Sequence, residues 1–233
     1  MEQIKKELKS FAEPGYDKKV QRYFKTGQGE YGEGDFFIGV KLPHIRSLAR
    51  KYFSITLGDL QLLAKSKVHE ERSLAALILV QKYDRSKTDK EQGRIFKAYC
   101  RNFKSWNNWD LVDISCPYIV GKHLLDDDKS ILFDWIKSKH LWTRRIAIVS
   151  NWWFIRKGDL SVIYRLSEQV LKDREDLMHK ATGWMLREAW KKDPQKTDSF
   201  LKKNYSHMPR VMLRYAIEKH PEVIRRKYLK GSI

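Results

Sequence analysis

The sequence predicts an all-α protein made of paired helices. Apolar residues recur at helical spacing, as in Ile4, Leu8 and Phe11, whereas a half-buried strand would alternate them at every second position. Helix punctuation agrees with this periodicity. Prolines stand at expected helix starts (Pro43, Pro194, Pro209 and Pro221), and glycines stand near expected turns (Gly58, Gly121 and Gly158).

Several of the expected helices resemble one another in sequence. The first, which carries Ile4, Leu8 and Phe11, would pack as an end cap. Three later helices, starting at Glu71, Thr143 and His179, each open with polar or basic residues and continue into small or apolar ones. The last two starts lie about 35 residues apart, close to the period of HEAT-like paired-helix repeats. This spacing favours a curved α-solenoid.

The domain organisation follows from composition. No stretch rich in Ser, Pro or Gly divides the 233 residues, so we expect one domain, residues 1–233. The hydrophobic content of 42% is sufficient for an ordinary core, and disorder is not indicated.

The chain is strongly basic, with 47 Lys and Arg against 29 Asp and Glu, a net charge of +18. Such an excess favours a polyanionic partner, with nucleic acid the first candidate. Residues 141–233 hold 21 basic and 10 acidic residues, or +11, which leaves +7 for the longer first part. We therefore expect a basic concave face that is densest in the C-terminal part.

Several classes of protein are disfavoured. The first seven residues alternate charge without an apolar signal region, and nowhere do 18 apolar residues run together, so we expect a cytoplasmic protein that does not enter the membrane. Cys100 and Cys116 lack the CxxC spacing, which predicts buried, reduced thiols. The seven histidines are scattered, and we expect no metal and no cofactor.

The glycines Gly27, Gly29 and Gly32 match the spacing of a dinucleotide-binding loop. The context does not fit that motif, because the preceding residues 20–25 have a helical pattern, and nearby Glu30, Glu33 and Asp35 would repel a pyrophosphate. We expect a loop between two helices.

The segment Asn107–Asp113 is the most informative one. Trp109 and Asp113 are four residues apart, so on a helix an electron-rich ring and an anion share one face and suit a cation. An alternative is that the tryptophan packs in the core and the aspartate is a helix cap. Trp184, with Arg187 three residues on, allows the same two interpretations.

Basic residues also gather at the starts and inner faces of the expected repeat helices. Any one of them is interpretable as a solvated surface charge, but as a set they predict a phosphate-binding footprint. The set consists of Arg144, Arg145, Lys180, Arg187, Arg210 and Arg214.

Together these segments resemble the AlkD-type DNA alkylation repair proteins, which are HEAT-like-repeat DNA glycosylases. The resemblance covers most of the chain. Its carriers are Gly29–Val40 with Pro43, Asn107–Asp113, Trp142–Arg145 and Gly183–Glu188. It implies an enzyme that hydrolyses the N-glycosidic bond of cationic alkylpurines, such as 3-methyladenine and 7-methylguanine, in duplex DNA and without a base-flipping pocket.

The resemblance also implies roles for individual residues. The family's catalytic carboxylate falls on Asp113, and its two sugar-facing tryptophans fall on Trp109 and Trp184. A phosphate-binding arginine matches Arg145, and Arg187 matches a second basic position beside the backbone. The expected partner is double-stranded DNA bound by a monomer, and the activity would be the first step of base excision repair.

The sequence departs from the family pattern in two places. Lys41 stands near a position where uncharged polar residues are expected, and Asn107 with Asn108 replaces part of a tryptophan pair. We include Lys41 and Arg46 among the candidate DNA contacts. Two other functions remain open: a non-catalytic nucleic-acid scaffold, and a protein-binding adaptor, which would leave the basic excess unexplained.

Overall fold

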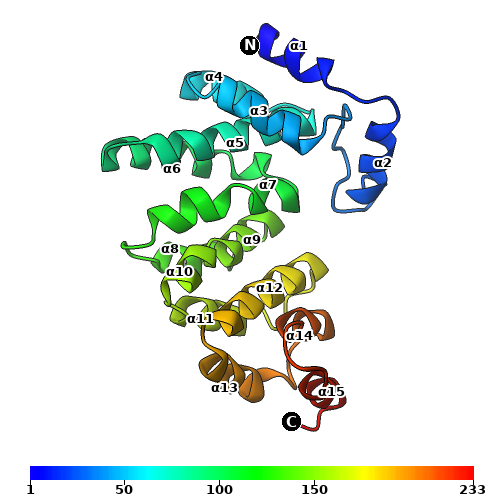
Figure 1. Ribbon diagram of the computed structural model, residues 1–233, viewed down its shortest axis with the longest axis vertical. Helices are drawn as coiled ribbons and strands as arrows, with labels where there is room; N and C mark the ends of the chain where they lie inside the picture. The colour runs from blue at the N-terminus through cyan, green and yellow to red at the C-terminus, as the bar shows by residue number, and fades with distance from the viewer. The chain divides into compact units, whose positions relative to one another are not determined.

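A computed structural model describes residues 1–233 (Figure 1). The regular secondary structure is helical throughout and includes no β-strand, which confirms the all-α prediction. Its helices form two compact units, Met1–Ile119 and Val120–Ile233. The helical segment Pro117–Gly121 crosses the division, so no loop linker separates the units. The prediction of one domain over residues 1–233 stays a prediction.

The first unit is organised around one long helix, α5, which packs against α3, α4, α6 and α7. Because α5 is apolar on every side through its middle, from Leu74 to Leu79, it is buried there. The helices of this unit are α1 (Glu2–Ser10), α2 (Tyr16–Tyr23), α3 (Leu42–Lys51), α4 (Leu57–Ala64), α5 (His69–Arg85), α6 (Asp89–Arg101) and α7 (Trp109–Asp113).

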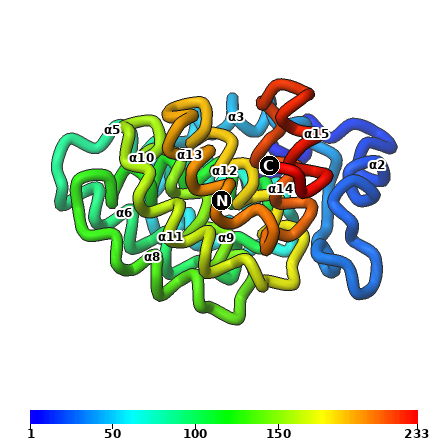
Figure 2. The backbone as a smooth tube through the Cα atoms, turned by 90° about the horizontal axis from the view of Figure 1, so that it is seen from below, coloured from blue at the N-terminus to red at the C-terminus, as the bar shows by residue number.

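Helix α2 differs from the other helices of the first unit, because none of its residues is buried. Figure 2 shows α2 apart from the α5 and α6 helices of the same unit. The expected loop at Gly27–Gly32 follows α2 and consists of turns, which confirms that prediction. A carboxylate of the loop itself stabilises this turn, because Glu30 accepts a hydrogen bond from the Gly27 backbone amide at 2.9 Å.

The second unit has the same plan around α12, which packs against α9, α10, α11, α13 and α14. Helix α14 approaches α12 closely at Gly183, where a Cβ atom would lie 2.5 Å from the Met212 carbonyl oxygen. The helices are α8 (Ser130–Trp135), α9 (Leu141–Val149), α10 (Trp152–Lys157), α11 (Ser161–Gln169), α12 (Asp176–Lys192), α13 (Pro194–Asn204), α14 (Arg210–Ala216) and α15 (Glu222–Lys230).

Most of the helix punctuation is confirmed. The prolines lie at the first or second residue of α3 and α13 and at the N-caps of α14 and α15. Gly158 ends α10 in the left-handed conformation. Gly121 itself lies inside a helical segment, and a turn begins three residues later at Leu124. A Cβ atom at Gly121 would lie 2.5 Å from the Ser150 carbonyl oxygen, so close packing requires the glycine.

The three similar segments form α5, α9 and α12, which begin two or three residues before the expected starts. Successive packed helices within each unit are consistent with an α-solenoid. The HEAT-like repeat and the basic concave face stay predictions. No helix has the length and apolar character needed to cross a membrane.

Candidate functional site

The short helix α7 carries both Trp109 and Asp113. Asn108 caps its start, because the side-chain oxygen accepts the Trp109 amide at 2.8 Å. Asp113 is the last residue of α7. The alternative in which Asp113 is a helix cap is therefore wrong.

A buried aspartate from another segment holds the start of α7. Asp35 accepts hydrogen bonds from the side-chain amides of Asn107 at 2.9 Å and Asn108 at 3.3 Å. The same carboxylate pairs with Arg72 at 2.6 Å and His69 at 3.1 Å. Burial alone would raise the pKa of Asp35, but the hydrogen bond from His69 and the charge of Arg72 lower it overall.

His69 links this aspartate to α7 itself. Its Nδ1 faces Asp35, and its Nε2 lies 2.8 Å from Asp110. Burial opposes protonation, yet the two carboxylates outweigh it and raise the pKa of His69 to about 9. The imidazolium therefore donates from both nitrogens at neutral pH. We call the six side chains the His69 cluster: Asp35, His69, Arg72, Asn107, Asn108 and Asp110.

Glu70 holds residues 38–40, just before α3, through hydrogen bonds to their backbone. Its carboxylate accepts the amides of Ile38 at 3.1 Å, Gly39 at 2.8 Å and Val40 at 3.2 Å. Gly39 has a φ of +81°, and a Cβ atom there would lie 2.9 Å from the Asp17 nitrogen on α2. Glu70 thus places this segment and α2 relative to the start of α5.

Trp109 lies at a half-buried position between aromatic side chains. Its ring stacks on that of Phe24 with the ring centroids 5.2 Å apart, and it meets the Tyr23 ring edge-on with the centroids 5.8 Å apart. Its Nε1 donates a hydrogen bond to the Tyr31 hydroxyl at 3.2 Å. By contrast, Trp106 is fully buried. Trp106 is the core tryptophan of this segment, and Trp109 is accessible on part of its surface.

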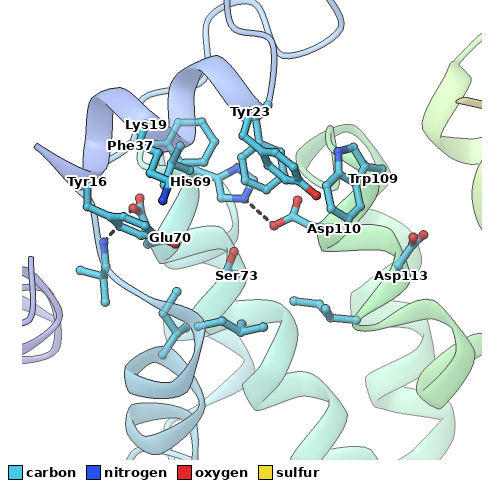
Figure 3. Close-up of a pocket in the computed structure, with 16 residues that line it drawn as sticks. Tyr16, Lys19, Tyr23, Phe37, His69, Glu70, Ser73, Trp109, Asp110 and Asp113 are labelled. Carbon is cyan, nitrogen blue, oxygen red and sulfur yellow. Dashed lines mark hydrogen bonds and ion pairs between the residues drawn. The ribbon is translucent and has the colours of Figure 1, made fainter. Parts of the chain in front are cut away.

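Trp109 and Asp113 line one cavity of about 460 Å³ between α2, α3, the start of α5 and the short helix α7. Figure 3 shows Tyr23 beside Trp109, with Asp110 and Asp113 on the same helix. Aromatic rings and carboxylates together favour a cationic ligand or a positive charge that develops during a reaction.

The third predicted site residue, Trp184, is a half-buried residue of α12 in the second unit. It follows Gly183, at which α14 approaches α12 closely. On the same helix, Arg187 pairs with Glu218 and lies 3.6 Å from Glu188. The catalytic role of Trp184 and the phosphate contact of Arg187 stay predictions.

Three other predicted cations have protein partners within the second unit. Arg144 binds Asp173 through two nitrogens at 2.8 and 3.3 Å. Arg145 is 5% exposed and donates to the Leu177 carbonyl oxygen at 2.6 Å. Lys180 pairs with Asp176 at 2.8 Å. The contacts of Arg144 and Arg145 join α9 to the segment at the start of α12, whereas the pair of Lys180 and Asp176 lies within α12. The phosphate-binding roles stay predictions.

The remaining candidates differ in their surroundings. Lys41 pairs with Glu13 at 2.7 Å, which raises the pKa of the lysine. Arg46 on α3 and Arg214 on α14 are exposed and form no ion pair. Neither of these two arginines is held by a carboxylate.

Sequence reasoning missed the residues that position α7. His69 to Arg72 form four consecutive titratable residues, and an apolar run begins after Ser73. Of these four residues only Glu71 entered the prediction, as the expected start of a helix. A charged first turn that precedes a buried helix is the signal that pointed to a buried ion cluster.

The protein is helical and has, beside a short helix, an aromatic cavity that is lined by carboxylates and by Lys19 and His69. Its sequence matches the DNA alkylation repair enzyme family over residues 4–220, so the chain belongs to that family, as the resemblance predicted. Family membership indicates a role in the repair of alkylated DNA, with DNA as a partner.

A solved structure shares the fold. It is described as "Predicted DNA alkylation repair enzyme from Enterococcus faecalis" and aligns with a TM-score of 0.72 at 18% identity. The alignment covers 91% of this chain and 97% of the other. No curated protein sequence matches the chain.

Proposed function

We propose that this protein is a DNA glycosylase that releases cationic alkylpurines, such as 3-methyladenine and 7-methylguanine, from duplex DNA. The observation that carries the proposal is the position of Trp109 and Asp113, which lie on one helix and line the same cavity. Following the family resemblance, a monomer would act without a base-flipping pocket and begin base excision repair.

The chemistry follows from the charge of the lesion. Alkylation makes the purine a good leaving group, so the glycosidic bond breaks with both electrons going to the base. The sugar becomes positively charged as the bond breaks, and the Asp113 carboxylate stabilises that charge. Asp113 also orients a water molecule and accepts its proton as the oxygen bonds to the sugar. The products are the neutral alkylpurine and an abasic site.

The tryptophans supply aromatic faces to the cationic sugar and base. Each such contact contributes on the order of 0.5–2 kcal/mol. Trp109 is oriented for this role by Phe24, Tyr23 and the Tyr31 hydroxyl. Trp184 is proposed as the second ring by the family resemblance. Because the lesion's own charge weakens the bond, neutral damaged bases are expected to be poor substrates.

The basic residues are proposed to bind the phosphate backbone. Arg145 and Arg187 match family positions, while Arg46 and Arg214 are exposed and unpaired in the structure. Arg144, Lys180 and Lys41 complete the proposed set, although each is already held by an acidic side chain.

The test is the release of free 3-methyladenine and 7-methylguanine from methylated duplex DNA, measured by chromatography with Asp113→Asn in parallel. We expect the variant to lose at least about 100-fold in release rate, because it cannot accept the proton of the attacking water. DNA affinity should stay equal or rise, since one anion near phosphate is removed. Asp126→Asn, on an exposed loop, is the matched control.

The second candidate function is a non-catalytic scaffold for nucleic acid, which the net charge of +18 alone would support. Folded wild-type protein that binds the duplex but frees no base would favour the scaffold. Unchanged release by Asp113→Asn would remove this carboxylate from the mechanism even if the protein is a glycosylase.

A further inference from the structure

Helix α6 carries a row of basic side chains that the proposed function does not use. Their spacing of four, three, four and three residues places them along one helical face. All five are exposed, and none forms an ion pair. We call them the α6 stripe: Lys90, Arg94, Lys97, Arg101 and, in the turn that follows α6, Lys104.

The stripe is opposite the packed face of α6. Ile95 and Tyr99 are buried, and α6 packs against α5 and α4. From residue 90 to residue 104 the only acidic residue is Glu91. Its carboxylate accepts the Lys87 amide at 3.1 Å near the helix start. The stripe therefore has no internal counter-charge along most of its length.

A groove runs beside the middle of the stripe. It has a volume of about 300 Å³ and is lined by Arg94, Lys97 and Arg101 of α6, opposite Gly58 and Gln61 of α4. The nearby acid, Asp59, is hydrogen-bonded to Thr56 at 2.7 Å. Three cations thus line a recess whose volume can hold an anionic group.

The α6 stripe is separate from the candidate active site. Figures 1 and 2 both place α6 and α2 on opposite sides of the first unit. The cavity that contains Trp109 and Asp113 lies beside α2. A ligand of the stripe would leave that cavity open.

We propose that the α6 stripe is a second DNA-binding surface, which contacts the phosphate backbone of duplex DNA independently of the lesion. From Lys90 to Arg101 the helix rises about 16 Å, at about 1.5 Å per residue. A duplex carries one negative charge per about 1.7 Å of its axis, so a row of cations of this length meets several phosphates.

The composition of the stripe favours DNA over a membrane surface. A membrane-bound helix places large apolar side chains in the interface beside its basic residues. No exposed large hydrophobic residue belongs to α6. The surface therefore offers charge without an apolar anchor, which suits a phosphate backbone.

The decisive measurement is the salt dependence of binding to unmodified duplex DNA, with Lys97→Gln/Arg101→Gln compared with wild type. Removal of two phosphate contacts should make the slope of log affinity against log salt shallower by about 1.8. Lys6→Gln/Lys9→Gln is the matched control, because these lysines of α1 are also exposed and unpaired. The control should keep the wild-type slope.

Two further readouts separate this proposal from the proposed function. Binding to unmodified DNA requires no base release, so the slope test holds even if the protein is not a glycosylase. If it is one, the single-turnover release rate at saturating protein should be equal in wild type and Lys97→Gln/Arg101→Gln. The charge-preserving Lys97→Arg/Arg101→Lys should restore the slope.

Three results would overturn the proposal. The stripe variant could keep the wild-type slope, or the control could lose as much slope as the stripe variant. Alternatively, the stripe variant could bind DNA normally and lose binding to phosphatidylserine vesicles, which would assign the surface to a membrane.

Discussion

The His69 cluster and the α6 stripe are both rich in basic groups, but their surroundings are opposite. His69 and Arg72 are buried, and both pair with Asp35 at 3.1 Å or less. Arg94 and Lys97 on α6 are exposed and have no acidic partner. The first set joins segments of the protein, whereas the second set is available to a partner.

The comparison shows why net charge alone locates no binding surface. A cation with a carboxylate at hydrogen-bonding distance has already lost most of its attraction for phosphate. Arg144, held by Asp173 at 2.8 Å, resembles the His69 cluster in this respect. A cation without such a partner can neutralise a phosphate and release the counterions condensed on the DNA. Unpaired cations are therefore directly available to phosphate, whereas a paired cation must first leave its carboxylate.

The largest expected effect is on the free energy of unfolding of the protein when the His69 cluster loses a carboxylate. Asp35→Asn would leave Arg72 and His69 buried with one carboxylate, Asp110, in place of two. Loss of one partner from a buried ion pair costs about 3–5 kcal/mol. We expect the free energy of unfolding, measured by urea denaturation, to fall by that amount.

The control for this change is Lys97→Gln on α6, which removes a charge that has no partner. Its free energy of unfolding should differ from wild type by less than about 0.5 kcal/mol. Equal losses in Asp35→Asn and Lys97→Gln would contradict the distinction between paired and unpaired charges.

The second effect is a dependence of stability on pH. The pKa of His69 is about 9 in the folded protein and about 6.5 in an unfolded chain. Because the folded value is the higher one, the stabilisation is complete below about pH 6.5 and is lost as pH rises through about 9. We expect wild type to lose on the order of 3 kcal/mol of unfolding free energy over this range.

His69→Gln isolates this contribution, since glutamine can donate a hydrogen bond but does not titrate. The difference in unfolding free energy between wild type and His69→Gln should shrink steadily from pH 6.5 to pH 9. A difference that stays constant across this range would show that His69 is neutral in the folded protein.

The sequence predicted those features that depend on local geometry. Trp109 and Asp113 are one helical turn apart, so helix formation is enough to bring them to one face. The helix starts at Pro194 and Pro209 are equally local, because a proline fixes its own φ angle. The row of cations on α6 was not predicted, because its exposure and its lack of partners are properties of the packed structure.

The sequence could not predict contacts between distant segments. His69 meets Asp35 and Asp110 across 34 and 41 residues, and periodicity within one helix does not encode such pairs. Helix α2 is a second example. The helical pattern of residues 20–25 does not show where the helix lies, and in the structure Tyr16, Val20 and Tyr23 line a cavity.

The smallest expected effect compares two glycines, one on a packed helix and one on α6. Gly183→Ala on α12 would place a Cβ atom 2.5 Å from the Met212 carbonyl oxygen and from the Tyr215 Cβ. Because backbone must shift to relieve that contact, we expect a loss of about 1–3 kcal/mol. Gly93→Ala on α6 would meet no atom within 4 Å, and we expect a gain of about 0.5–1 kcal/mol from helix propensity.

Thermal unfolding of the two alanine variants measures this contrast directly. The midpoint should fall for Gly183→Ala and rise for Gly93→Ala. A fall for Gly93→Ala would mean that the outer side of α6 is covered, and the same cover would then compete with DNA for the α6 stripe. Because Gly93 directly precedes Arg94 in the chain, this pair of variants tests the accessibility of the stripe without altering any of its charges.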